Sequence, residues 1–265
     1  MPSHPAIRLA VVAAALLALV PAGPRAEAAD PAPAPVAAAE KKSPITFELT
    51  PYLWLGNLDG TVGTGMNSAD IDYGFDEILD DLDFGAMVSL EAREGPWGFL
   101  FDAMYLRLSD DADTGDPTYD DVDVSVDELV LGGALAYRVA DDGAVRADML
   151  AGVRYWEIDT EVELKSDVSP DLEVDDSEYW LDPVVGGRLG FDLGSNFFVV
   201  AYGDVGGFDV GSDLTWQVIG TIGYRFSEAF SASVGYRYLD VDYEEDDFVF
   251  DTVTAGFIAG VTFSF

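Results

Sequence analysis

Cysteine is absent from this sequence of 265 residues, and the only histidine is His4. His4 lies in an amino-terminal segment that we expect to be removed on export, so the mature chain offers neither a thiol nor an imidazole. This absence excludes a Ser-His-Asp triad, a cysteine nucleophile and a histidine-ligated metal. Carboxylate pairs such as Asp182 and Asp192 remain, but among 50 acidic residues such pairs arise without any catalytic role. We therefore expect a protein that is not an enzyme.

Basic residues are also scarce. The chain has 13 Lys and Arg residues against 50 Asp and Glu residues, and removal of residues 1–28 leaves 11 against 49, a net charge of −38. A surface of this sign repels phosphate groups, so nucleic acid is not an expected partner. The acids gather between apolar alternating segments, where loops are expected.

No apolar run is long enough for a membrane-spanning helix. The longest, residues 9–20, is about half of the ~20 residues that such a helix needs. A basic residue precedes this run and the small-x-small sequence AEA follows it, a pattern typical of a cleaved signal peptide over residues 1–28. Residues 29–45 are rich in Pro and Ala, which indicates an extended periplasmic linker. The folded domain is therefore expected over 46–265, and any membrane span in it must be built of strands.

Strict alternation is what the sequence does contain, most clearly near its end. From Val253 to Phe265 every second residue is apolar, and the residues between are mostly small or polar. This period of two indicates a strand with one apolar face. Because it ends on Phe265, the segment resembles the closing strand of bacterial outer-membrane β-barrels, whose final residue is usually Phe and is read by the barrel assembly machinery. The resemblance implies that Phe265 is an assembly signal and that this machinery is a partner.

Alternating runs bounded by turn residues recur along the whole domain. They predict an all-β protein of ten strands, or of eight if the segment around 196–206 is misassigned. Short and long connections alternate, which is typical of a transmembrane antiparallel up-and-down β-barrel with short periplasmic turns and longer, acidic extracellular loops. A short helix is expected within 75–82. The expected strands are 47–56, 84–93, 98–108, 127–139, 144–158, 179–192, 196–206, 214–226, 230–242 and 251–265.

Arginine provides the most specific signal for the barrel interior. On the register that turns apolar side chains outward, seven arginines point inward and Arg107 points outward. An arginine facing lipid at mid-depth costs roughly 2–4 kcal/mol, so a barrel requires this arrangement. Inward acids complement the arginines. The expected lumen network comprises Arg93, Arg138, Arg146, Arg154, Arg188, Arg225 and Arg237 with Asp102, Glu128, Asp148, Asp182 and Asp204.

Two interpretations of this network are open. In the first, the arginines near the short turns form a basic ring that selects ions or small solutes. In the second, salt bridges plug a narrow lumen and hold the strand register, because barrels of few strands fill most of their interior with side chains. The ring of the first interpretation would consist of Arg93, Arg138, Arg146, Arg188 and Arg225.

Aromatic residues are expected in two bands, one at each membrane interface, where amphipathic rings are favoured. The band near the short turns would hold Trp97, Tyr137, Tyr224, Phe226 and Phe263, and the band near the long loops would hold Tyr52, Trp54, Tyr105, Tyr155, Trp156, Tyr179, Trp180 and Tyr238.

The acidic connection after 98–108 begins like a calcium loop, with Asp111-x-Asp113-x-Gly115. It then departs from the motif, since Gly115 stands where an oxygen ligand belongs and no Glu closes the loop. One interpretation is loosely bound Ca²⁺ or Mg²⁺ that bridges to lipopolysaccharide phosphates, and the other is a solvated, self-repelling loop. No other cofactor is expected. The low-affinity ligands would be Asp110, Asp111, Asp113, Asp116, Asp120 and Asp121.

The export signal, the even strand number, the alternating connections, the inward charges and the Phe263-Ser264-Phe265 end together resemble the small outer-membrane β-barrel proteins of Gram-negative bacteria. The opacity-protein and OmpW-like groups are the nearest comparison. The resemblance implies a location in the outer membrane, in contact with its lipid and lipopolysaccharide. Fold constrains function only loosely. We expect a structural barrel or narrow passive channel, or else a surface interaction protein whose acidic loops bind cations, lipopolysaccharide or an external partner; a soluble secreted barrel is the third alternative.

Overall fold

The computed structural model describes residues 44–64, 68–113, 121–165, 172–245 and 248–265. These residues belong to one compact unit, Lys42–Phe265. The expected signal peptide and nearly all of the expected linker lie outside the described residues. Within the described part of the chain, no helix has the length and apolar character needed to cross a membrane.

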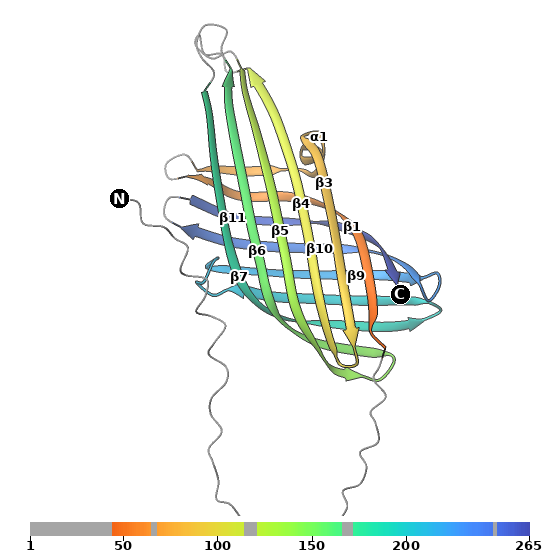
Figure 1. Cartoon of the computed structure of the whole chain (residues 1–265). Coiled ribbons are helices and arrows are strands. Elements are labelled where there is room, and N and C mark those ends of the chain that lie inside the picture. Colours follow the sequence, from red (N-terminus) through yellow and green to blue (C-terminus); the bar gives the residue numbers. More distant parts are fainter. Residues whose placement is uncertain (1–43, 65–67, 114–120, 166–171, 246–247) are drawn as a thin grey trace, which may run out of the picture. The chain divides into compact units, whose positions relative to one another are not determined.

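Ten antiparallel strands form a closed barrel in which each strand pairs with its neighbours in sequence, and β11 pairs with β1. This confirms the predicted up-and-down barrel of ten strands and rules out the eight-strand alternative (Figure 1). The barrel strands are β1 (Thr46–Thr64), β3 (Leu82–Glu94), β4 (Trp97–Asp113), β5 (Asp121–Asp141), β6 (Val145–Lys165), β7 (Leu172–Gly194), β8 (Phe197–Gly207), β9 (Leu214–Arg225), β10 (Phe230–Glu245) and β11 (Phe248–Ser264).

The first long connection contains two further elements. A short strand, β2 (Ala69–Tyr73), pairs with the end of β1, and the helix α1 (Phe75–Asp80) follows it. The helix was predicted, whereas β2 was not. Its sequence, ADIDY, has too few apolar residues to stand out from the surrounding acidic loop.

The first and last strands hold the barrel closed. The backbone N–H of Phe47 donates to the carbonyl of Phe265, and the N–H of Phe265 donates back to Phe47, both at 2.9 Å. The pairing continues along the strands, with Leu55 opposite Phe257. No barrel edge is left open at this seam, as a membrane requires, because an unpaired backbone group in hydrocarbon is costly.

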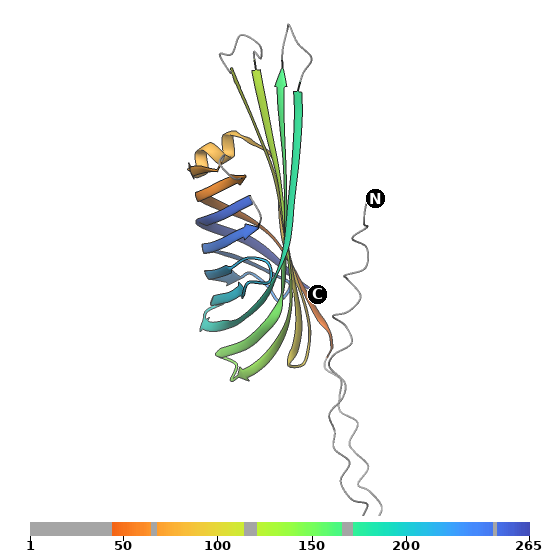
Figure 2. The ribbon, with the colours of Figure 1, turned by 90° about the vertical axis from the view of Figure 1, so that its left-hand side faces the viewer.

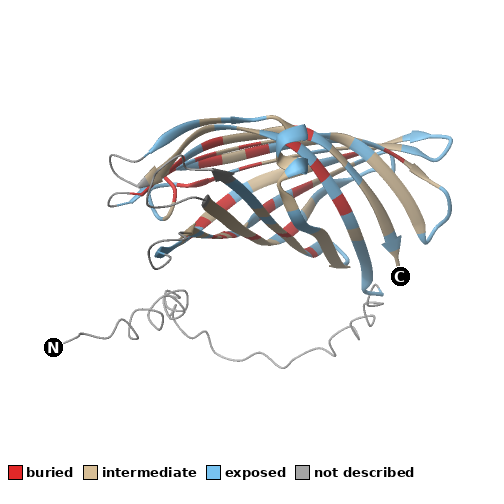
Figure 3. Ribbon diagram, turned by 90° about the horizontal axis from the view of Figure 1, so that it is seen from above, coloured by how far each residue is buried: buried red, intermediate tan, exposed pale blue. Residues whose placement is uncertain are grey.

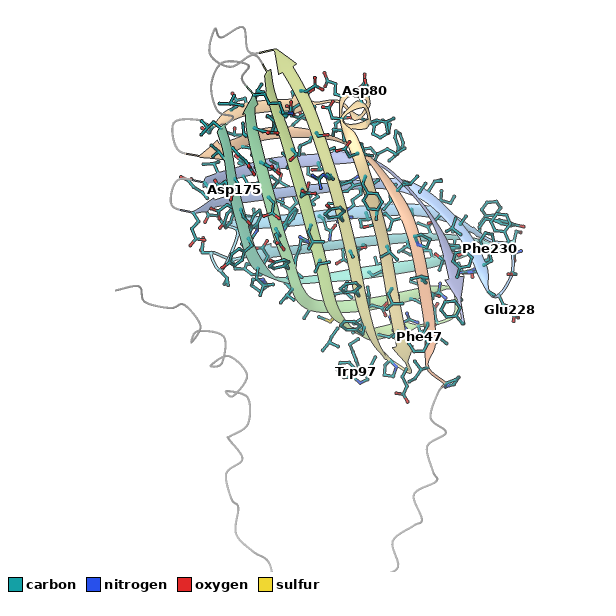
Figure 4. All side chains as sticks on the ribbon, turned by 45° about the horizontal axis from the view of Figure 1, so that its top comes forward. Phe47, Asp80, Trp97, Asp175, Glu228 and Phe230 are labelled. Atoms are coloured by element: carbon teal, nitrogen blue, oxygen red, sulfur yellow. The ribbon has the colours of Figure 1, made fainter. Side chains whose placement is uncertain are left out.

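The connections define two ends of the barrel. At the end that we name the turn end, four short turns join β3 to β4, β5 to β6, β7 to β8 and β9 to β10. Gly95 and Gly143 take positive φ angles of 57° and 87° in two of them, a conformation that glycine adopts without strain. Trp97, Phe47 and Phe230 lie at this end, whereas Asp80 and Asp175 lie toward the opposite, loop end (Figure 4).

Strands β4 to β7 rise past the other strands at the loop end, as Figures 1 and 2 show. Much of 109–126 and 159–178, which we expected to be loop, is therefore strand. The stretch 121–127 shows why the prediction was wrong. Val122, Val124 and Val126 alternate with acidic or polar residues, so the period of two is present, but the density of acids resembles that of a loop.

Outward side chains form an apolar belt around the barrel. Leu53, Leu135 and Phe257 are 62%, 60% and 70% exposed, and large exposed hydrophobic residues occur on all ten barrel strands. Buried and exposed residues alternate along the strands (Figure 3). Soluble monomers rarely expose so large an apolar surface, so lipid is the solvent that this belt fits.

Candidate functional site: the barrel lumen

A cavity of about 540 Å³ occupies the half of the lumen nearest the turn end. All seven arginines predicted to point inward line it, as do Asp102, Asp148 and Asp204. Glu128 and Asp182 are not among its lining residues. Asp182 is instead buried above the cavity, where it accepts hydrogen bonds from the backbone and hydroxyl of Ser212. We refer to this cavity as the chamber.

Three of the arginines near the turn end are paired with two carboxylates. Asp148, on β6, lies 2.8 Å from Arg138 and Arg188 and 3.0 Å from Arg93. Glu91, on β3, lies 2.6 Å from Arg188 and 2.9 Å from Arg93. These five residues, the Asp148 network, tie β3, β5, β6 and β7 together across the lumen. Their arrangement is that of an internal salt-bridge network rather than of an open basic ring.

The other two members of the expected ring lie nearer the mouth of the chamber. Arg225 is paired with Asp192 at 2.7 Å and lies over the ring of Phe198. Arg146 lines the chamber without an ion pair closer than 4 Å among the residues that the structure describes. Outside the lumen, Arg107 lies 4.0 Å from Asp127 and is about half exposed, as its outward assignment requires.

Deeper in the chamber, Arg154 and Asp204 form a buried pair. One guanidinium nitrogen of Arg154 donates to both oxygens of Asp204, at 2.8 and 2.9 Å. Tyr202 and Gln217 also donate to Asp204, at 2.6 and 2.7 Å, and Thr215 accepts from Arg154. Buried ions are tolerated when their remaining hydrogen-bonding capacity is satisfied in this way. The alternation of inward residues predicted the charges, but not which charge meets which.

Above the chamber, aromatic rings fill the lumen. Trp156 and Trp180 stack at 5.5 Å, Trp180 and Tyr243 stack at 4.1 Å, and Phe250 lies 5.7 Å from Trp180. Trp156 and Tyr243 are each 1% exposed. None of these four rings lines the chamber, so the cavity ends beneath them. We name the whole cluster the aromatic plug; it comprises Tyr52, Trp54, Met104, Val130, Trp156, Ile158, Trp180, Leu239, Val241, Tyr243, Phe248 and Phe250.

The plug corrects one sequence prediction. Tyr52, Trp54, Trp156 and Trp180 were expected in the outer band near the long loops, but they lie inside the barrel. Tyr179, from the same expected band, does face outward and is 68% exposed. Alternation predicts the inward position of Trp156, because residues two apart share a face and Trp156 follows the inward Arg154 by two positions. The band at the turn end is where we predicted it, with Trp97, Tyr137, Phe226 and Phe263 exposed.

Arg237 joins the two halves of the lumen. Its guanidinium lies 4.4 Å above the ring of Trp54 and 3.3 Å from the hydroxyl of Tyr52. Tyr52 in turn donates to Asp102 at 2.9 Å. A cation over an indole is attracted by the negative face of the ring, which allows this charge to sit against the apolar plug.

Four of the six expected cation ligands lie in the described part of the chain, and these four belong to two paired strands. Asp110, Asp111 and Asp113 lie on β4, with Asp111 opposite Asp123 and Asp113 opposite Asp121 on β5. Neighbouring residues of a strand point to opposite faces, so Asp110 and Asp111 face different sides of the sheet. Asp116 and Asp120 lie outside the described residues. Among the residues that are described, no three acidic, cysteine or histidine side chains gather as a metal site.

The likeness of this chain to known proteins is one of fold alone. No protein-family model matches the chain, and neither does any curated protein. Among solved structures, the outer membrane protease OmpT from Escherichia coli shares 9% identity with a TM-score of 0.50, over 86% of this chain and 98% of its own. Ail, the attachment invasion locus protein of Yersinia pestis, shares 11% identity with a TM-score of 0.39, over 83% and 99%. Neisserial surface protein A shares 13% with a TM-score of 0.34, over 85% and 100%. With the closed barrel of ten strands, the likeness to OmpT shows that this chain has the fold of the small outer-membrane β-barrel proteins.

Proposed function

We propose that the protein is a non-enzymatic barrel of the bacterial outer membrane, closed to through-flow, that anchors the rising sheet of β4 to β7 at the cell surface for interaction with an external partner. The observation that carries the closed lumen is the aromatic plug. It occupies the lumen between the chamber and the loop end, and its largest side chains are almost completely buried.

The location rests on the apolar belt and on the seam between β1 and β11. In this setting the turn end, where the barrel domain begins and ends, faces the periplasm, and the loop end faces outward. The rising sheet then stands beyond the bilayer. Its outward face is acidic, with Asp111, Asp123, Glu163 and Glu173 side by side on four strands. Such a face suits water rather than hydrocarbon.

The non-enzymatic assignment rests on the state of the carboxylates. Asp148 and Asp204, the best-buried acids of the chamber, are held by arginines and hydroxyl groups in fixed pairs. A general acid or base needs a proton that it can exchange with substrate, which such pairing opposes. OmpT is a protease, but at 9% identity its activity gives no support for one here.

Paired substitutions on β5 test the position of the bilayer. Leu135→Arg places a charge in the apolar belt, and we expect it to lower the free energy of unfolding by about 2–4 kcal/mol. Ser125→Arg lies on the same face of the same strand but in the rising sheet, opposite Glu161, and its effect should stay within about 0.5 kcal/mol. Urea titration of the refolded protein in lipid vesicles measures both. Equal effects of the two substitutions would contradict the assigned membrane position.

Planar-bilayer recording tests the closed lumen. The purified protein is expected to give no stepwise conductance, because water and ions find no path through the aromatic plug. The passive-channel alternative has one observation in its favour, since the chamber is open to the turn end, where Ser227 and Glu228 line it. Reproducible single-channel steps would support that alternative and overturn the closed-barrel proposal. A gel that compares boiled with unboiled protein verifies that the recorded sample is folded.

A further inference from the structure

The mouth of the chamber holds a cation and an anion that have no close partner. Arg146 on β6 and Glu48 on β1 both line the chamber. Among the described residues, neither makes a hydrogen bond or an ion pair of 4 Å or shorter. Every other arginine of the chamber does have a partner of this kind. Two charges of opposite sign are therefore available to a ligand.

Arg146 and Glu48 face each other across the lumen. In the order of the barrel strands, β1 and β6 are separated by β3, β4 and β5 on one side and by β7 to β11 on the other. Glu48 and Arg146 both lie within the first three residues of their strands, and both strands begin at the turn end. The two charges attract each other but are too far apart for contact. A bound molecule can bridge them.

The wall of the chamber between these two charges offers hydroxyl groups. Thr221 on β9, Ser231 and Ser233 on β10, and Ser264 on β11 line the chamber, and within the described structure their side chains make no hydrogen bond. A hydroxyl both donates and accepts, so this wall suits a peptide group, which has one donor and one acceptor. At about 540 Å³, the chamber is in the size range of small-molecule sites.

The charge of the chamber favours a ligand without net charge. Seven arginines and six acidic residues line it, so its own charges nearly balance. A simple anion would meet Glu48 and a chain whose formal net charge is −37. A simple cation would meet the arginines. A molecule with a carboxylate at one end and an ammonium group at the other satisfies Arg146 and Glu48 together, through charge-assisted hydrogen bonds.

We propose that the chamber binds a small zwitterion, a free amino acid or short peptide, whose carboxylate is held by Arg146 and whose ammonium group is held by Glu48. The aromatic plug lies beyond the far end of the chamber, so the ligand enters and leaves at the turn end, where Figure 4 shows Glu228 on the rim. This site goes beyond the proposed surface role, because it opens at the end of the barrel opposite to the rising sheet.

Calorimetric titration of the full-length, folded protein in an uncharged detergent tests the proposal. The probes are glycine, diglycine and triglycine, which share their charged ends and differ in the distance between them. We expect saturable binding that is strongest for the compound whose length matches the gap between Arg146 and Glu48. Acetylation of its amino group, or amidation of its carboxylate, removes one charge and should weaken binding at least about tenfold.

Substitutions at the two free charges provide the matched variants. Arg146→Gln and Glu48→Gln should each weaken binding of the zwitterion at least about tenfold. Arg146→Gln should no longer distinguish the zwitterion from its amide, and Glu48→Gln should no longer distinguish it from its acetylated form. An unboiled gel verifies that each variant is folded. Arg107→Gln and Glu94→Gln remove the same charges outside the chamber and should bind within about twofold of the unmodified protein.

The absence of saturable heat with all three compounds would overturn the site. Equal binding of the capped and uncapped compounds, or an equal loss in the lumen variants and the outer variants, would also overturn it. The proposed function would stand after any of these results, because the absence of conductance and the effect of Leu135→Arg are measured separately. A failure of those two tests, with binding of the zwitterion intact, would instead overturn the closed membrane barrel and keep the site.

Discussion

Replacing Asp148 with Asn is expected to lower the free energy of unfolding by about 3–5 kcal/mol, the penalty typical of breaking a buried ion pair from one side. Asp148 accepts from Arg93, Arg138 and Arg188, and its side chain is 3% exposed. Asn keeps the size and one acceptor oxygen but removes the charge. Glu91 would then be the one carboxylate left inside the network for these arginines. The positive charges repel one another, and in a confined lumen there is too little water to screen this repulsion fully.

Asp141→Asn is the matched control for this prediction. Asp141 also pairs with Arg138, at 3.2 Å, but it lies at the turn end and its side chain is 45% exposed. The backbone N–H of Gly143 and the guanidinium of Arg138 lower the pKa of Asp141, so the substitution removes a true charge at neutral pH. Its cost should stay below about 1 kcal/mol, as for other exposed pairs. Urea midpoints in vesicles compare the two variants, and similar midpoints would refute the central role of Asp148.

Removing two rings of the aromatic plug, in Trp156→Ala/Trp180→Ala, is expected to produce stepwise conductance in planar bilayers. Trp180 contacts three other rings of the plug, those of Trp156, Tyr243 and Phe250. The double variant therefore removes the centre of the cluster. The chamber would then continue toward the loop end. The same change should lower stability by at least about 3–5 kcal/mol, because large core side chains are lost.

Trp216→Ala is the control for the plug. Trp216 lies on β9, stacks on Tyr238 at 4.9 Å and belongs to the outer face, next to the inward Gln217. Its loss should reduce stability without creating conductance. Folded protein is first separated on an unboiled gel, so that leakage from misfolded material is excluded. Steps of similar size in both variants would show that the rings do not close the lumen.

The sequence predicted the barrel and its inward charges because both depend on one local rule, alternation. The same rule puts Trp156 on the inner face with Arg154, and Phe250 on the inner face with Thr252, because residues two apart share a face. Alternation alone could therefore have predicted the plug. It was missed because tryptophan was assigned by its preference for membrane interfaces instead of by its strand position. Where interface preference and strand position disagree, the strand position determines which face a tryptophan occupies.

Alternation along a strand cannot predict which charged side chains pair with each other inside the lumen. Arg188 and Glu91 are 97 residues apart and meet at 2.6 Å across the interior of the barrel. Their meeting depends on the tilt and stagger of all ten strands, which link the barrel width to the register. No single segment encodes these quantities. The extent of β4 to β7 was underestimated for a simpler reason, because acids on a solvated strand resemble those of a loop.

The height of β4 to β7, together with the plug, constrains the order of assembly. In the proposed outer-membrane setting, the acidic loop-end stretches of these strands have to pass the hydrocarbon layer to reach the far side, and each charge resists that passage. A finished barrel of the proposed closed kind offers them no aqueous route, because the aromatic plug occupies the lumen above the chamber. On the proposed closed barrel, we therefore expect β4 to β7 to cross before β1 and β11 join, with the backbone contacts between Phe47 and Phe265 among the last to form.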